Sequence, residues 1–470
     1  MQNPSIHETD PDYLSEYLHL VTETAPGQAI NCWAKAFESA RADWQLPRCR
    51  HLLREAKGWN QTDEIVQAQI FISDGILQQQ LGEWTEAERR YRQALSRAHT
   101  TGYAHGVARS LNNLALLYLE MGDLTRSAKY AEASLNLSRQ IESEVDVVHA
   151  LGNLGIVYRR REAWEEAVRC FDECLVLFRK QGDRYNEGRT LINLGNLYRA
   201  QNRFEEAMVC YEQDLSICRK LEDCHGEAQA LNNLGLIQYA LRRWDQAITS
   251  YRESLALLQM LEDTNSQRLV LNNLAMVYDD FERWDESLSC YESALLLCRT
   301  LGQRKEEAQI LNNMAVTYRK LERWTPAYRC IDESLELYRD LGDRKREATV
   351  LLNHCVLVYD QALRDGLTAK NVSEVLQMAQ QAWTVADEVD SNQERMKLAQ
   401  LCAEVTSNIP QLMDQVPDYL EAALRYAREL SHQALTVAQT QTEHIVQRWK
   451  AQGCEDEAYA LVEQLKRIEM

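Results

Sequence analysis

The chain has 470 residues, a formal net charge of −19 and a hydrophobic share of 45%. A negative charge of this size disfavours binding to nucleic acid and to anionic membrane surfaces. The sequence contains no run of about eighteen apolar residues and therefore predicts no membrane span. Its polar, acidic start lacks the basic-then-apolar pattern of a secretory signal.

The first part of the chain precedes the regular pattern that dominates the rest. A short helix is expected at residues 13–22, within an N-terminal segment that we place at 1–26. Residues 27–67 resemble a degenerate copy of the later pattern. Trp44 falls on its forty-residue grid, whereas Trp33 stands where the later copies carry asparagine. A degenerate terminal repeat is expected to cap an array of repeats.

From residue 68 the chain repeats itself every forty residues. The stretch LNNLGLIQYALRRWDQAITSYRESLALLQMLED, from Leu231, returns as LNNLAMVYDDFERWDESLSCYESALLLCRTLGQ, from Leu271. Each copy has the periodicity of two amphipathic helices joined by a short turn, and a fixed period of this length indicates a solenoid. The turn after the second helix is expected at four glycines: Gly102, Gly182, Gly302 and Gly342. We predict an all-α fold with eight repeats of about forty residues over 68–387, the last one irregular.

The pattern weakens toward the C-terminus. An insertion, QALRDGLTAKN, is expected to lengthen the turn inside the eighth repeat. Further helices are expected at 372–388, 393–408, 416–439 and 441–467. We interpret 388–470 as a C-terminal helical capping bundle, and a small partner-binding module is the alternative.

Several residue types recur in register along the repeats. An asparagine column consists of Asn113, Asn153, Asn193, Asn233, Asn273, Asn313 and Asn353. Two positions later comes a small residue, at Ala115, Gly155, Gly195, Gly235, Ala275 and Ala315. Eleven positions after the asparagine, a large apolar residue opens the second helix, at Leu124, Trp164, Phe204, Trp244, Trp284 and Trp324. An aromatic column follows at Phe171, Tyr211, Tyr251 and Tyr291.

This combination of small and aromatic columns is similar to the tetratricopeptide repeat (TPR), although the period is forty rather than thirty-four residues and the usual proline after the second helix is missing. The resemblance implies a right-handed superhelical solenoid of paired antiparallel helices, helix A and helix B. The NNLA or NNLG stretch in helix A is similar to that of kinesin light chain, of Pins-type polarity scaffolds and of arrays attached to bacterial caspase-like proteases. The fold does not name the partner, because function depends on sites rather than on folds.

The asparagine column is the first candidate binding feature. The resemblance implies that this position of helix A faces the concave groove of a peptide-binding array. A carboxamide both donates and accepts hydrogen bonds, so a line of asparagines could hold a peptide backbone. The alternative is that each asparagine bonds to a neighbouring helix and fixes the stacking of the repeats.

Basic residues of helix A form the second candidate feature. Arg159, Arg199 and Arg319 lie near the end of helix A and Arg189 lies near its start. Their periodicity directs them toward the same groove, where arginine could bind acidic side chains or a C-terminal carboxylate bidentately. Acidic residues such as Asp279 occupy matching positions, so the groove is expected to be mixed, and a solvated helix face is the alternative.

The thirteen cysteines are spaced as packing residues. Cys170, Cys210, Cys290 and Cys330 share one column of helix B, where a free cysteine packs as a small core residue. No pair has the CxxC spacing of a zinc site. Many unpaired cysteines predict a reducing, cytoplasmic location.

No catalytic motif stands out. The ten histidines form neither HExxH nor HxH, and no glycine-rich phosphate loop occurs. Cys224 and His225 are adjacent in an inter-repeat turn, but they lack the orienting third group of a nucleophilic dyad. The tryptophan column could stack bases, but packing at the start of helix B explains it better. We expect no catalytic residue, no metal site and no cofactor.

These features predict a non-enzymatic scaffold that holds an extended or helical segment of a partner protein in its concave groove. The alternative is a regulatory subunit or effector-gated sensor that controls a separate enzyme, for example a protease or a signalling ATPase. A protein or peptide partner is expected, and neither nucleic acid nor a membrane is.

Overall fold

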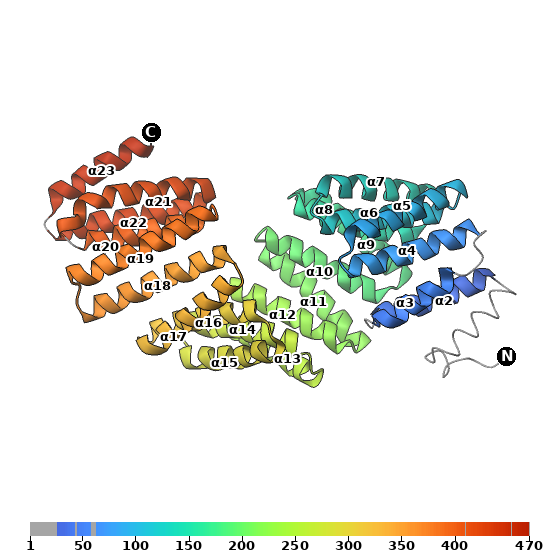
Figure 1. Ribbon diagram of the computed structural model, residues 1–470, viewed down its shortest axis with the longest axis horizontal. Helices are drawn as coiled ribbons and strands as arrows, with labels where there is room; N and C mark the ends of the chain where they lie inside the picture. Colours follow the sequence, from blue (N-terminus) through green and yellow to red (C-terminus); the bar gives the residue numbers. More distant parts are fainter. Residues whose placement is uncertain (1–25, 43–44, 58–62, 409, 453, 470) are drawn as a thin grey trace. The chain divides into compact units, whose positions relative to one another are not determined.

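The computed structural model describes residues 26–42, 45–57, 63–408, 410–452 and 454–469, and all of these ranges are helical apart from short turns (Figure 1). The all-α prediction is confirmed: each helix packs against the next from α2 to α11 and from α13 to α23. The helix expected at 13–22 lies outside the described residues, as does Trp44. The chain divides into two compact units, before and after the Ala230–Leu231 bond.

The first unit and the helix that spans the division have these bounds: α2 (Pro26–Ala42), α3 (Leu46–Lys57), α4 (Glu64–Gln80), α5 (Trp84–Thr100), α6 (Ala104–Glu120), α7 (Leu124–Gln140), α8 (Glu144–Arg160), α9 (Trp164–Gln181), α10 (Arg184–Ala200), α11 (Phe204–Leu221) and α12 (Cys224–Ala240). The second unit continues with α13 (Trp244–Met260), α14 (Thr264–Asp280), α15 (Trp284–Leu301), α16 (Arg304–Lys320), α17 (Trp324–Asp340), α18 (Arg344–Asp365), α19 (Ala369–Glu388), α20 (Asn392–Ser407), the 3-10 helix η1 (Pro410–Gln415), α21 (Val416–Leu430), α22 (His432–Ala451) and α23 (Glu455–Glu469). From α4 to α19, helix A is even-numbered and helix B is odd-numbered.

The turns between helices recur at a fixed spacing along the chain. A residue with positive φ ends each helix from α4 to α17, once every twenty positions: Gly82, Gly102, Gly122, Glu142, Glu162, Gly182, Asn202, Glu222, Arg242, Glu262, Glu282, Gly302, Glu322 and Gly342. The four predicted stop glycines are therefore confirmed. After several of these stops an aspartate caps the next helix, as Asp123 does by accepting from the backbone N–H of Arg126 at 2.8 Å. The recurrent Gly-Asp pair thus ends one helix and starts the next.

Helix A and helix B of one repeat approach closely because glycine faces an aromatic ring. A Cβ atom added to Gly235 would lie 2.7 Å from Cε1 of Tyr251, and one added to Gly155 would lie 2.7 Å from Cε1 of Phe171. Both rings are buried. In the repeat of α6 and α7, the aromatic position of helix B is occupied by Ala131, and the small position of helix A is then Ala115 instead of glycine. The size of the helix B residue therefore explains most of the choice between glycine and alanine in helix A.

A second contact inside the repeats uses a buried hydroxyl. Ser134 Oγ donates to the Ala108 carbonyl at 2.8 Å, and Ser334 Oγ donates to the Ala308 carbonyl at 2.8 Å. Each bond joins helix B to helix A of the same repeat, 26 residues earlier. Asp214 occupies this position in α11 and is 1% exposed.

Three expectations about the C-terminal part were wrong. The insertion does not lengthen the turn of the eighth repeat, because helix α18 continues through it to Asp365 before Gly366 breaks the helix at φ 99°. The helix expected at 416–439 is interrupted at Ser431, whose extended backbone and side chain cap α22.

The helix expected at 441–467 is likewise divided, between Ala451 and Glu455. The helices expected at 372–388 and 393–408 are present as α19 and α20. Helices α20 to α23 share a buried core around Leu420, Ile445 and Trp449. Their capping role and the domain boundaries given above remain predictions.

Among the described residues, none of the helices is both long and apolar enough to cross a lipid bilayer. The described cysteines are all free thiols. Those of the helix B column are buried or half-buried, as their spacing predicts.

Candidate functional site

The asparagine column forms a hydrogen-bonded ladder between consecutive repeats. Four of its members donate from Nδ2 to Oδ1 of an asparagine 41 residues earlier: Asn153 to Asn112 at 2.8 Å, Asn273 to Asn232 at 3.1 Å, Asn313 to Asn272 at 3.3 Å and Asn353 to Asn312 at 2.9 Å. The doubled asparagines are therefore explained, because the first residue of each pair accepts from the next repeat. This is the bond that the stacking alternative requires.

The other three members of the column lack such a bond. Among the described residues, Asn113, Asn193 and Asn233 have no hydrogen-bond partner for their carboxamides, and each is only half-buried. The cause is visible in the sequence, because the residues 41 positions earlier are Ile72, Gly152 and Ile192, which offer no side-chain acceptor. These three carboxamides keep their full capacity to bind a ligand.

The basic residues of helix A differ between the two units. In the second unit, Arg319 forms an ion pair with Asp360, and Lys320 Nζ lies 2.6 Å from Oδ2 of Asp279. The Tyr239 hydroxyl donates to Asp280 Oδ2 at 2.5 Å. Each of these contacts again joins positions 41 residues apart. The predicted site residue Arg319 is thus already neutralised within the protein.

In the first unit the corresponding arginines have no acidic partner. Arg159, Arg189 and Arg199 form no ion pair with any described carboxylate. Desolvation by burial lowers the pKa of Arg159, and the nearby positive charges of Arg160 and Arg199 lower it further. A cluster of unpaired positive charge therefore lies along α8 and α10, although the chain as a whole is strongly acidic.

A small polar pocket lies on the helix A side of the first unit. It has a volume of about 120 Å³, and α6 and α8 supply most of its polar lining, including Arg109, Asn112, Asn113 and His149. Arg109 and His149 were not predicted as site residues from the sequence. The signal that could have found them is their own column, which carries Arg109, His149 and Arg189 in the first unit but Leu269 and Gln309 in the second.

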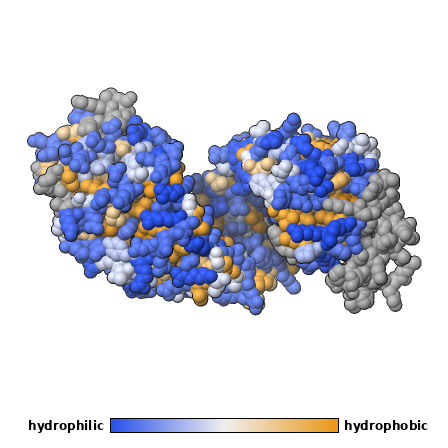
Figure 2. Space-filling view, viewed as in Figure 1, coloured by the Kyte–Doolittle hydropathy of each residue, from blue (hydrophilic) through white to orange (hydrophobic). Residues whose placement is uncertain are grey.

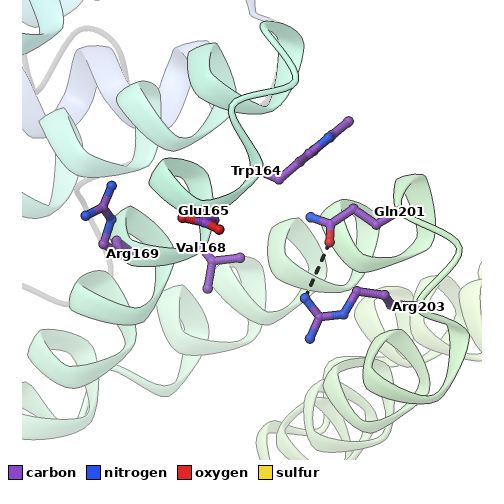
Figure 3. A pocket seen from close by; sticks show the side chains of 6 residues that line it. All are labelled: Trp164, Glu165, Val168, Arg169, Gln201 and Arg203. Carbon is purple, nitrogen blue, oxygen red and sulfur yellow. Dashed lines mark hydrogen bonds between the residues drawn. The ribbon is translucent and has the colours of Figure 1, made fainter.

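A larger, open pocket lies at the edge of the repeats. It has a volume of about 310 Å³, with Trp164 and Val168 of α9 on one side and Gln201 and Arg203 on the other (Figure 3). Arg203 Nη1 donates to Gln201 Oε1 at 3.4 Å. Trp164 is half-buried and packs against the apolar core of its own unit, in agreement with the packing interpretation of the tryptophan column. This pocket brings together no nucleophile and base.

The surface and the remaining side chains do not define a reaction centre. Hydrophilic residues cover most of the face drawn in Figure 2, with apolar residues in short stripes between them. Among the residues that the structure describes, no group of three His, Cys, Asp or Glu side chains could hold a metal ion. Cys224 is exposed at the start of α12, and His225 Nε2 lies 2.8 Å from Gln229 Nε2.

Paired helices of 17 or 18 residues from α4 to α17, a residue with positive φ after each of them and a polar ladder along helix A define a helical-repeat protein. Family models described as "Tetratricopeptide repeat" match residues 75–140, 146–220, 230–263 and 266–340, together slightly more than half of the chain. The chain belongs to the tetratricopeptide repeat family. Members of this family mediate protein binding and are typically not catalytic. No curated protein matches the chain.

Solved structures are similar at the level of the fold. A signal transduction ATPase with a tetratricopeptide repeat sensor from Pyrococcus horikoshii is 14% identical with a TM-score of 0.54, covering 80% of this chain and 54% of its own. The quorum sensor NprR from B. thuringiensis is 14% identical with a TM-score of 0.50, covering 69% of this chain and 97% of its own. BtubC (BKLC) from P. vanneervenii is 20% identical with a TM-score of 0.39, covering 46% of this chain and 91% of its own.

Proposed function

We propose that this protein is a non-enzymatic scaffold that binds an extended or helical segment of a partner protein along the helix A face. The observation that carries the proposal is the set of unused polar groups on that face. Among the described residues, the carboxamides of Asn113, Asn193 and Asn233 have no partner. The other members of their column donate to the first asparagine of a doubled pair in the preceding repeat. A peptide backbone supplies the donors and acceptors that such carboxamides lack.

The unpaired arginines add a preference for negative charge. Arg159, Arg189 and Arg199 stand on helix A of the first unit and have no acidic partner within the part of the chain that the structure describes. Arginine binds carboxylates through two parallel hydrogen bonds. Acidic side chains or a C-terminal carboxylate of the bound segment would therefore lie against α8 and α10.

The chain contains its own matched control for this proposal. The double variant Asn193→Ala/Asn233→Ala removes unbonded carboxamides, and Asn273→Ala/Asn313→Ala removes bonded ones. The first should weaken peptide binding about tenfold and leave the melting temperature almost unchanged. The second should lower the free energy of unfolding by roughly 1–3 kcal/mol, since two hydrogen bonds are lost at about 0.5–1.5 kcal/mol each.

The assay uses 12-residue peptides selected by display on the full chain, with calorimetry for affinity and thermal melts for stability. The scaffold proposal is wrong if no peptide is selected. It is also wrong if the selected peptides bind the Asn193→Ala/Asn233→Ala variant as tightly as the unaltered protein.

A regulatory or sensing role is the second candidate. Two structures of similar fold with TM-scores of 0.50 and above are described as a quorum sensor and as an ATPase with a repeat sensor. In this role the same face would bind an effector, and binding would change the activity of a separate enzyme. Co-purification of an enzyme whose rate changes on addition of a selected peptide would support this role, and a rate that does not change would exclude it for that enzyme.

A further inference from the structure

The small pocket between α6 and α8 carries an inference that deepens the proposed function and rests on it. Its volume of about 120 Å³ admits one small polar group and a few water molecules. Ile76 and Ala108 provide its apolar lining, and the polar groups come from α6, α7 and α8. The pocket is therefore of a size for a single side chain of a bound segment rather than for a cofactor.

The pocket is rich in hydrogen-bond donors that the protein leaves unused. The guanidinium of Arg109 and the carboxamide of Asn113 have no partner among the described residues. Asn112 accepts from Asn153 through Oδ1 at 2.8 Å, which leaves its own amide group available to donate. These donors lie on successive positions of one face of α6, at i, i+3 and i+4.

The only carboxylate in the lining of this pocket is already engaged. Asp146 Oδ2 lies 2.8 Å from Nδ1 of His105 and accepts from the Ser143 hydroxyl at 2.8 Å. Arg189 of α10 lies close enough to His149 to influence its charge, and it has no acidic partner among the described residues. Asp146 thus supplies one negative charge against the two guanidinium charges of Arg109 and Arg189, so positive charge remains in excess around the pocket.

We propose that this pocket binds the ionised carboxylate of an aspartate or glutamate side chain in the partner segment. Arg109 donates to the carboxylate together with the amide groups of Asn112 and Asn113, and Arg189 adds a long-range attraction. The second unit carries Leu269 and Gln309 in the column of Arg109 and His149 and lacks these charges. The acidic residue of the ligand is therefore recognised by the first unit.

His149 couples this binding to pH. His149 is exposed on one side, but the surrounding helices desolvate its imidazole and lower its pKa; Asp146 of α8 raises this pKa, and Arg109 of α6 and Arg189 of α10 lower it. A carboxylate that enters the pocket adds a negative charge beside the ring and raises its pKa, because an opposite charge favours the charged form. Binding then takes up a proton, so the affinity rises as the pH falls, as long as the ligand carboxylate stays ionised.

The test uses the full chain and three labelled peptides whose binding is followed by fluorescence anisotropy at low salt. They are hexaglutamate with an amidated C-terminus, hexaglutamine with an amidated C-terminus, and hexaglutamine with a free C-terminus. We expect saturable binding of the hexaglutamate amide, about five- to tenfold weaker binding to Arg109→Gln, and no change with Arg169→Gln. Arg169 is a matched control, since its side chain is 73% exposed on helix B of the same unit.

The pH arm compares affinities at pH 5.5 and 7.5. The unaltered protein should bind the hexaglutamate amide several-fold more tightly at pH 5.5, and His149→Gln should lose most of this difference. The proposal is overturned if the hexaglutamate amide does not bind, or if Arg109→Gln and Arg169→Gln bind it equally well. Tighter binding of hexaglutamine with a free C-terminus would assign the pocket to a terminal carboxylate instead of a side chain.

These experiments distinguish a failure of the carboxylate pocket from a failure of the scaffold proposal. If display-selected peptides depend on Asn193 and Asn233 but not on Arg109, the scaffold stands and the carboxylate pocket is refuted. If binding of the hexaglutamate amide depends on Arg109 while Asn193→Ala/Asn233→Ala binds the selected peptides normally, the carboxylate pocket stands. The proposal that the unbonded asparagines hold a peptide backbone is then refuted. Circular dichroism and thermal melts of each variant confirm that the protein remains folded.

Discussion

Replacing Asp214 by serine should make the protein more stable above pH 7. Asp214 stands where Ser134 and Ser334 donate to a helix A carbonyl, but an ionised carboxylate has no proton to donate. Its Oδ2 has no hydrogen-bond partner, and the Cys218 thiol reaches Oδ1 at 3.8 Å. Gly188 of α10 faces the Asp214 side chain, and only glycine fits there, since a Cβ atom on residue 188 would lie 2.6 Å from Oδ1 of Asp214. The protonated acid could instead donate, as the serines do.

Burial is the main cause that raises the pKa of Asp214, from 3.8 to about 7, with the bond from Cys218 opposing the change and the charge of Asp223 adding to it. Because the folded state holds this proton more tightly, stability is greatest below pH 4, falls as the pH rises to 7, and is constant above that. The total loss is about 4 kcal/mol at most, at about 1.4 kcal/mol for each unit of pKa.

The assay is a series of thermal melts from pH 4 to pH 8 on the unaltered protein, Asp214→Ser and the isosteric Asp214→Asn. The difference between the unaltered protein and Asp214→Ser should grow steadily between pH 4 and 7. It should reach roughly ten degrees in melting temperature at pH 8, given about 2–4 degrees for each kcal/mol in a unit of this size. An equal dependence on pH in all three proteins would refute the account of Asp214 as a buried, destabilising charge.

Three further expectations follow from the repeats. Gly235→Ala should lower the free energy of unfolding by about 1–3 kcal/mol, because the added Cβ would overlap the Tyr251 ring. Gly152→Ala, whose Cβ meets nothing within 4 Å, should be neutral or stabilising in the same chemical denaturation assay. Arg242→Gly should raise the free energy of unfolding by up to about 1 kcal/mol, because the residue adopts φ 57°, which glycine accepts without strain; a loss of stability in urea titration would contradict this. Thiol titration should count all thirteen cysteines in denaturant and should find exposed Cys224 the fastest in the native protein, since burial raises the pKa of others, such as Cys402 to about 12.

The features that depend on local sequence were predictable. The forty-residue period and the stop glycines follow from spacing and from backbone freedom within one repeat. The left-handed conformation of Glu162 and Arg242 was not evident, because nothing in either side chain marks it. The break at Ser431 was missed for a similar reason, since neither glycine nor proline accompanies it.

The candidate site was predictable only in part, because its decisive relations cross from one repeat to the next. The asparagine column was recognised, but whether a carboxamide is bonded depends on the residue 41 positions earlier, such as Gly152 for Asn193. In the same way, the column of Arg319 predicted a groove cation, whereas Asp360 of the following repeat neutralises it. Arg109 and His149 escaped notice because they belong to a column that is charged in one unit only.

The ladder also bears on how the array could have changed in length. Each bonded asparagine links to the repeat before it, and the turns that precede α14 and α16 are equivalent. Recombination that removes residues 264–303 would join Asp263 to Arg304 and place Asn313 where Asn273 had been. Asn313 would then donate to Asn232 in place of Asn273. A gain or loss of one such repeat would leave no carboxamide of the bonded ladder unpaired.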